Sequence, residues 1–165
     1  MEKFLITGGR SLHGEIIASG SKNAALPLFF LSLMASDKCE IRRVPNLTDI
    51  QIALEILEIF GVTHEAKSTN SFYLNPSGIR FKVAPYELVS KMRASILILG
   101  PLLAKYKVAK VSLPGGCAIG SRPINLHLDA LKKMGTHIKL KDGYVVASAK
   151  NGLKGCYYKF PKISV

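Results

Sequence analysis

The stretch PGGCAIGSRPINL at residues 114–126 joins a predicted strand to a predicted helix. Val111–Leu113, just before it, is expected to be the end of the strand. Pro114 and the two glycines after it break the strand and allow backbone angles that other residues rarely adopt. Pro123 suits the first turn of a helix, which the apolar spacing over Leu126–Met134 continues. The sequence therefore predicts a strand, an exposed loop and a helix in this order.

This loop carries a thiol, Cys117, five positions before a guanidinium, Arg122. The guanidinium and the helix N-terminus make the surroundings electropositive, which lowers a thiol pKa and favours a bound anion. Two interpretations stay open at this point. Cys117 is either a reactive thiol on an exposed loop or a small apolar residue that the fold buries.

The composition is that of one folded domain with a real core. The chain has 165 residues, of which 48% are hydrophobic, and its formal net charge is +12. This length and apolar content argue against disorder, and the positive charge favours anionic partners. The basic residues are scattered, without a run of five or more, so a tail dedicated to nucleic acid is not expected.

The cysteines and the apolar segments limit the cellular compartments in which this protein is expected. Cys39, Cys117 and Cys156 are odd in number and form neither a CxxC pair nor a zinc-binding spacing, so we expect no metal site, no disulfide framework and a cytoplasmic protein. Met1–Gly9 lacks the apolar core of a signal peptide. Leu26–Ala35, the longest apolar run, is too short to span a bilayer, so no membrane partner is expected.

Two similar halves follow one another along the chain. The first half predicts strands at 4–6 and 14–18, a helix at 24–35, a strand at 39–44, a helix at 50–60, a hairpin of 62–65 with 71–74, and a strand at 79–83. The second half predicts a helix at 96–104, a strand at 108–113, a helix at 126–134, a hairpin of 136–140 with 144–147, and a strand at 155–160. The pattern recurs after roughly 70 residues, and Gly61 and Gly135 end the corresponding helices as C-caps would.

The start of the first long helix carries an unexpected charge. Ser21 is a plausible N-cap, and Lys22 follows it where the helix dipole is already positive. A cation at this position makes sense when an anion binds beside it. The alternative is a lysine that simply faces solvent.

Three segments resemble signatures of the UDP-N-acetylglucosamine enolpyruvyl transferases, in the same order and spacing. They are Gly20–Pro27, Met92–Ser95 and the cysteine loop Pro114–Leu128. The resemblance covers the whole chain. It implies an α+β fold of the α-β prism type, in which repeated β/α units place helices inside and sheets outside.

The resemblance also implies the domain organisation. Residues 1–21 would be opening strands of another domain, and residues 22–165 would be an incomplete cysteine-bearing domain. Its repeats would be about 22–91 and 92–161, with a third starting at 162–165. The expectation is that this chain is the front part of a longer protein whose second domain is missing, and that it is inactive until that domain is supplied, covalently or as a separate chain.

The implied reaction transfers an enolpyruvyl group from phosphoenolpyruvate to the 3-hydroxyl of UDP-N-acetylglucosamine and releases phosphate. This is the first committed step of peptidoglycan synthesis. The resemblance implies no metal and no organic cofactor, the two substrates as partners, and neither nucleic acid nor membrane.

Residue roles follow from the resemblance by position. Cys117 would be the proton donor and could form a covalent adduct with phosphoenolpyruvate. Lys22 and Arg122 would hold the anionic groups of phosphoenolpyruvate, Asn23 would bond a reactant hydroxyl or phosphate, and Arg93 would lie on the side of the UDP-sugar.

The nucleotide site is implied in the same way. It would be lined by Arg122, Pro123, Ile124, Asn125 and Leu126, and touched by Lys162, Ser164 and Val165. Asn125 stands where the family usually has Asp, so one contact changes from a carboxylate to an amide that still accepts a hydrogen bond. The family's catalytic base would lie in the missing domain.

Four other interpretations remain. The sister enzyme acting on shikimate 3-phosphate does not need the cysteine loop. RNA 3′-terminal phosphate cyclases share the repeat but need a catalytic histidine in another segment than His127. A basic RNA-binding module fits the charge, yet Phe72–Tyr73 and Tyr157–Tyr158 lie in no RNA-binding signature. A non-catalytic fragment with unpaired sheet edges is the fourth.

Overall fold

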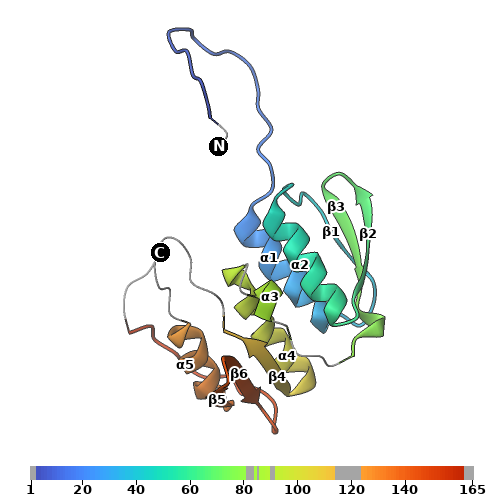
Figure 1. Cartoon of the computed structure of the whole chain (residues 1–165), viewed down its shortest axis with the longest axis vertical. Helices are drawn as coiled ribbons and strands as arrows, with labels where there is room; N and C mark the ends of the chain where they lie inside the picture. The colour runs from blue at the N-terminus through green and yellow to red at the C-terminus, as the bar shows by residue number, and fades with distance from the viewer. Residues whose placement is uncertain (1–2, 81–83, 85, 90–91, 114–123, 162–165) are drawn as a thin grey trace.

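The computed structural model describes residues 3–80, 84, 86–89, 92–113 and 124–161, and only the backbone of Leu88 and Arg93. Within these ranges two copies of one α/β unit follow each other (Figure 1). The first unit contains α1 (Lys22–Leu31), η1 (Ser32–Met34), β1 (Cys39–Ile41), α2 (Thr48–Ile59), β2 (Thr63–Ser68), β3 (Ser71–Asn75) and η2 (Pro76–Gly78). After α3 (Tyr86–Val89), the second contains η3 (Arg93–Ile98), α4 (Leu99–Tyr106), β4 (Val108–Ser112), α5 (Asn125–Lys133), β5 (His137–Lys141) and β6 (Tyr144–Ser148).

The two sheets have the same topology. Strand order is β1-β3-β2 in one and β4-β6-β5 in the other, and every pair of neighbours is antiparallel. In both sheets the last strand of the hairpin lies in the middle, between its hairpin partner and the strand that precedes the second helix. The repeat predicted from the sequence is therefore confirmed at the level of strand pairing.

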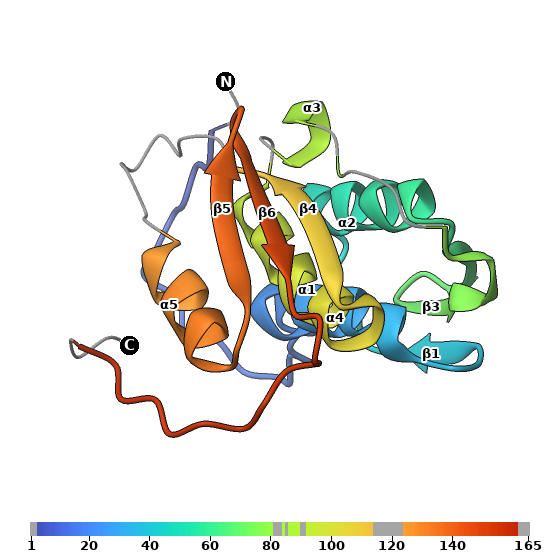
Figure 2. The same cartoon turned by 90° about the horizontal axis from the view of Figure 1, so that it is seen from below.

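Both units share one core, which the helices fill. Phe29 and Phe30 of α1, Phe60 after α2, Leu103 of α4 and Val145 of β6 are all fully buried in a single cluster. The β4-β6-β5 sheet lies in front of α4 and α1 when the molecule is seen from below (Figure 2). The predicted arrangement of helices inside and sheets outside is confirmed. None of the helices in the described part of the chain combines the length and apolar character that a membrane span requires.

Three predicted strands differ from the structure. Residues 3–21 form no strand, and this segment runs away from the body in Figure 1 with Phe4, Leu5 and Ile16 more than nine-tenths exposed. Residues 155–160 form no strand either. A β-strand needs a neighbour for its N–H and C=O groups, and the described chain offers none to these two segments.

The predicted strand at 79–83 is also wrong where it can be judged. Ile79 and Arg80 lie outside any strand, residues 81–83 lie outside the described ranges, and Ala84 forms an isolated parallel bridge with Val111. In addition, β1 stops at Ile41, three residues earlier than predicted, because Arg43 takes a φ of 57° that no extended strand allows.

The glycines that end α2 and α5 have the predicted role. Gly61 has a φ of 92° and Gly135 a φ of 93°, the left-handed geometry of a C-cap. In both caps the following residue donates its N–H back to the helix: Val62 to Leu57, and Thr136 to Leu131. The surroundings differ. A Cβ at Gly61 would overlap the carbonyl oxygen of Gly78, whereas a Cβ at Gly135 would meet nothing within 4 Å.

This difference predicts unequal effects of the same substitution. Gly135→Ala should lower the free energy of unfolding by about 1 kcal/mol, the cost of a left-handed alanine, whereas Gly61→Ala adds a steric overlap and should lower it by about 2–3 kcal/mol. Urea unfolding followed by circular dichroism measures both. Equal losses would show that the contact with Gly78 relaxes without cost.

Candidate functional site

Two polar residues begin the central helix α1. Ser21 is its N-cap in extended geometry, without a side-chain hydrogen bond, and its carbonyl accepts the N–H groups of Ala24 and Ala25 at 3.2 and 2.9 Å. Lys22 and Asn23 are exposed in the first turn, whereas every residue of the helix beyond them is apolar and half of these residues are buried. The predicted pair of binding residues is therefore presented together at the accessible end of an otherwise apolar helix.

Gly20 fixes the entry to this helix. A Cβ at this position would lie on the backbone carbonyl of Arg43, so only glycine allows the chain to pass so close to the segment that leads from β1 to α2. The approach brings the N-terminus of α1 alongside that segment.

The helix that this segment enters, α2, provides a partner for Lys22. Its Nζ lies 2.6 Å from Oδ2 of Asp49, in the first turn of α2. No sequence motif connects Asp49 to Lys22. The sequence does place opposite charges at the two helix starts. Their pairing follows only from the packing of α1 on α2, which the sequence does not show.

The second unit places its predicted residues at two further helix starts. Arg93 is the first residue of η3, after Met92 in extended geometry, and only its backbone is described. Asn125 begins α5, and the Leu128 N–H donates to the carbonyl of Ile124 at 3.1 Å. Asn125 is exposed, while Ile124 and Leu126 are half-buried.

The remaining predicted residues lie outside the described ranges. These are Cys117, Arg122, Pro123, Lys162, Ser164 and Val165. The structure describes both ends of the cysteine loop: β4 ends at the buried Ser112, Leu113 donates its N–H to Gly143 at 2.8 Å, and α5 begins at Asn125. The loop thus leaves a strand and enters a helix, as predicted.

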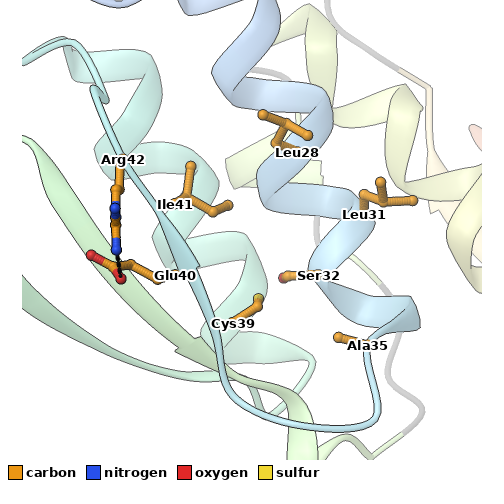
Figure 3. A pocket seen from close by; sticks show the side chains of 8 residues that line it. All are labelled: Leu28, Leu31, Ser32, Ala35, Cys39, Glu40, Ile41 and Arg42. Atoms are coloured by element: carbon orange, nitrogen blue, oxygen red, sulfur yellow. Dashed lines mark hydrogen bonds and ion pairs between the residues drawn. The ribbon is translucent and has the colours of Figure 1, made fainter.

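An apolar pocket of about 360 Å³ lies beside the other end of α1 (Figure 3). Leu28 and Leu31 approach it from the helix, and Cys39 and Ile41 from β1. At its rim, hydrogen bonds from Arg42 and Lys67 hold the Glu40 carboxylate and lower its pKa to about 2. Among the described residues, none of the predicted substrate-binding residues lines this pocket.

Two cysteines lie in the described part of the chain. Cys39 is half-buried, its thiol donates to the carbonyl of Leu74 at 3.6 Å, and burial raises its pKa. Cys156 is exposed. Among the described residues, no three His, Cys, Asp or Glu side chains gather as a metal site would require.

The sequence and the fold agree with one family of proteins. The sequence model of EPSP synthase (3-phosphoshikimate 1-carboxyvinyltransferase) matches residues 6–165. The chain belongs to this family. Among solved structures, the enolpyruvyl transferase NikO from Streptomyces tendae superposes with a TM-score of 0.73 at 24% identity, over 90% of this chain and 32% of that one. At this identity the superposition supports the fold alone.

Curated relatives are much more similar in sequence. The chain is 48% identical over 165 residues to a UDP-N-acetylglucosamine 1-carboxyvinyltransferase from Idiomarina loihiensis and 51% identical over 168 residues to one from Endomicrobium trichonymphae. Both alignments cover the whole of this chain and 39% of the relative. The chain thus spans about two fifths of the length of these relatives.

The different surroundings of the two described cysteines predict different reactivity. At pH 8 Cys39 should react with iodoacetamide about tenfold more slowly than Cys156, because the thiolate is the nucleophile and a buried thiol with a raised pKa forms less of it. Peptide mapping by mass spectrometry gives the two rates. In urea the rates should converge, and equal rates in the native chain would contradict the described burial.

Proposed function

We propose that the chain carries the phosphoenolpyruvate-binding side of an enzyme that transfers an enolpyruvyl group to the 3-hydroxyl of UDP-N-acetylglucosamine, in the cytoplasm, as the first committed step of peptidoglycan synthesis. The observation that carries this proposal is the exposed pair Lys22 and Asn23 at the start of α1, in a chain about half identical to enzymes of that name. Groups outside these 165 residues would supply the base.

The proposed reaction is an addition followed by an elimination. Cys117 delivers a proton to C3 of phosphoenolpyruvate, the sugar 3-oxygen bonds to C2, and a base takes the hydroxyl proton. A proton then leaves C3, the double bond returns, and the bond from C2 to the phosphate oxygen breaks, so that inorganic phosphate departs with the electron pair. No electrons are gained or lost overall.

The negative charges of phosphoenolpyruvate indicate what the basic residues of the site would bind. A phosphate and a carboxylate on one small molecule need fixed cations and donors close together. Lys22 stands at a helix N-terminus, where the backbone N–H groups also favour an anion. With Arg122 and Asn23 it would form the donor-binding end of the site.

The acceptor would bind on the second unit. Asn125 is exposed at the start of α5, next to Ile124 and Leu126, and Arg93 begins η3. We propose that these residues face the UDP-sugar, together with Pro123, Lys162, Ser164 and Val165.

An RNA-binding role receives less support. Tyr73 lies on β3 with the ammonium groups of Lys38 and Lys67 4.0 and 5.2 Å from its ring centroid. Those lysines pair with Glu65 at 3.3 Å and with Glu40 at 3.0 Å. Because carboxylates already balance this aromatic and basic cluster, it is a poor platform for a polyanion. We propose neither nucleic acid nor a membrane as a partner.

The proposed function predicts selective labelling of one cysteine. An epoxide analogue of phosphoenolpyruvate should alkylate Cys117 through opening of the ring by the thiolate, and UDP-N-acetylglucosamine should accelerate it by completing the site. Intact-mass and peptide mass spectrometry of the purified 165-residue chain measure the adduct. The matched control is iodoacetamide, which carries no anionic group to be recognised. Slow and equal labelling of Cys39, Cys117 and Cys156, unaffected by the nucleotide sugar, would overturn the proposal.

The departure at Asn125 provides a test of the acceptor side. A carboxylate accepts a stronger hydrogen bond than an amide, so Asn125→Asp should lower the UDP-N-acetylglucosamine concentration that gives half-maximal acceleration of labelling by about fivefold. Asp129→Asn, further along α5, is the control for a change of charge on the same helix. An unchanged half-maximal concentration would remove Asn125 from the proposed nucleotide site.

A further inference from the structure

Asp49 is positioned to act on the proposed site without being part of the resemblance that suggested it. Its Oδ2 lies 2.6 Å from Nζ of Lys22, and the two residues begin helices that pack against each other. The Lys22 side chain is 44% exposed and the Asp49 side chain is 31% exposed. The pair is therefore accessible from solvent, and a ligand can reach the ammonium group.

The ion pair holds a lysine at the start of α1, where the helix dipole disfavours a positive charge. A lysine in the first turn of a helix is repelled by the helix dipole, and its long side chain has many rotamers that would carry the charge into solvent. The first turn of α1 contains no acidic residue that could hold it. Asp49, on the neighbouring helix, holds the ammonium group beside the N-terminus of α1.

The second unit serves as an internal comparison. It has the same order of strand, helix and hairpin and the same sheet topology, yet the first turn of α5, which corresponds to α2, contains no acidic residue. An acid at this helix start is therefore not needed to form the unit. An exposed ion pair also contributes little to stability. Both points indicate that the role of Asp49 lies in its contact with Lys22 and not in folding.

We propose that Asp49 is a positioning residue, which holds the Lys22 ammonium group in place for the phosphate or carboxylate of phosphoenolpyruvate. This inference rests on the proposed function. Asp49 does not touch the substrate itself. It restricts Lys22 to one arrangement before the anion arrives, so that binding does not have to order a free side chain.

Gly20 belongs to the same arrangement. Because its lack of a Cβ allows the backbone to lie on the carbonyl of Arg43, the start of α1 stays close to the stretch that leads into α2, where Asp49 lies. Two contacts of different kinds, one between backbone atoms and one between charges, thus join the same two stretches of chain.

The test measures binding separately from reaction. The rate of Cys117 labelling by the epoxide analogue, followed against analogue concentration with UDP-N-acetylglucosamine present, gives a half-saturation constant and a maximal rate constant. Asp49→Asn and Asp49→Ala should raise the half-saturation constant about tenfold, because a lysine freed from its partner must be ordered on binding, and change the maximal rate constant by less than about twofold. Asp49→Glu, which keeps the charge on a longer arm, should restore part of the affinity.

The matched control is Glu55→Gln, which removes one negative charge from an exposed position of the same helix and should leave both constants unchanged. Urea unfolding of each variant establishes that the chain is folded. Selective labelling of the wild-type chain together with an unchanged or lowered half-saturation constant in Asp49→Asn would overturn the role of Asp49 alone. A fall in the maximal rate constant that parallels lost stability would do the same, because it indicates a structural role. Unselective labelling of the wild-type chain would overturn the proposed function and this inference with it.

Discussion

The burial of α1 is the constraint on which the rest of the described structure depends. This helix packs against α2, η3 and β1, and its residues Ala25, Leu26, Phe29 and Phe30 are buried. The residues of α1 beyond Asn23 that face outward are apolar as well. The polar side chains that α1 presents are therefore confined to its start. Lys22 and Asn23 occupy the one end at which the backbone N–H groups are also free to meet an anion.

Much of the fold could be predicted because each unit consists of locally determined pieces. Gly61 and Gly135 mark helix ends, and the apolar alternation on either side of a polar turn marks each hairpin. The predictions are wrong at residues 4–6, 14–18 and 155–160, where an apolar run forms no strand. Alternating apolar and polar residues indicate that one face of a segment prefers the core and the other prefers solvent. A strand exists only when another backbone also lies beside it. That partner is a property of the whole fold.

The residues of the candidate site also fall into those that short motifs predict and those that only the packing reveals. Lys22, Asn23 and Asn125 were recognisable from short motifs, and they do lie at accessible helix starts. Asp49 was not recognised, since it stands 27 positions from Lys22 and belongs to a different helix. No local pattern joins two residues at that distance. The contact arises because α1 and α2 both begin at the same end of the unit, which follows from their packing and from the close approach at Gly20.

The charges at this end of the unit form a sequence of partners rather than a single pair. The α2 N-terminus favours the Asp49 carboxylate, the carboxylate attracts the Lys22 ammonium group, and that group lies beside the N-terminus of α1, which by itself would repel it. The ion pair with Asp49 offsets the Lys22 charge, while the backbone N–H groups at the start of α1 still favour an anion. Under the proposed function, this arrangement places a held cation beside the N–H groups of a helix start, where a small molecule that carries both a phosphate and a carboxylate would bind.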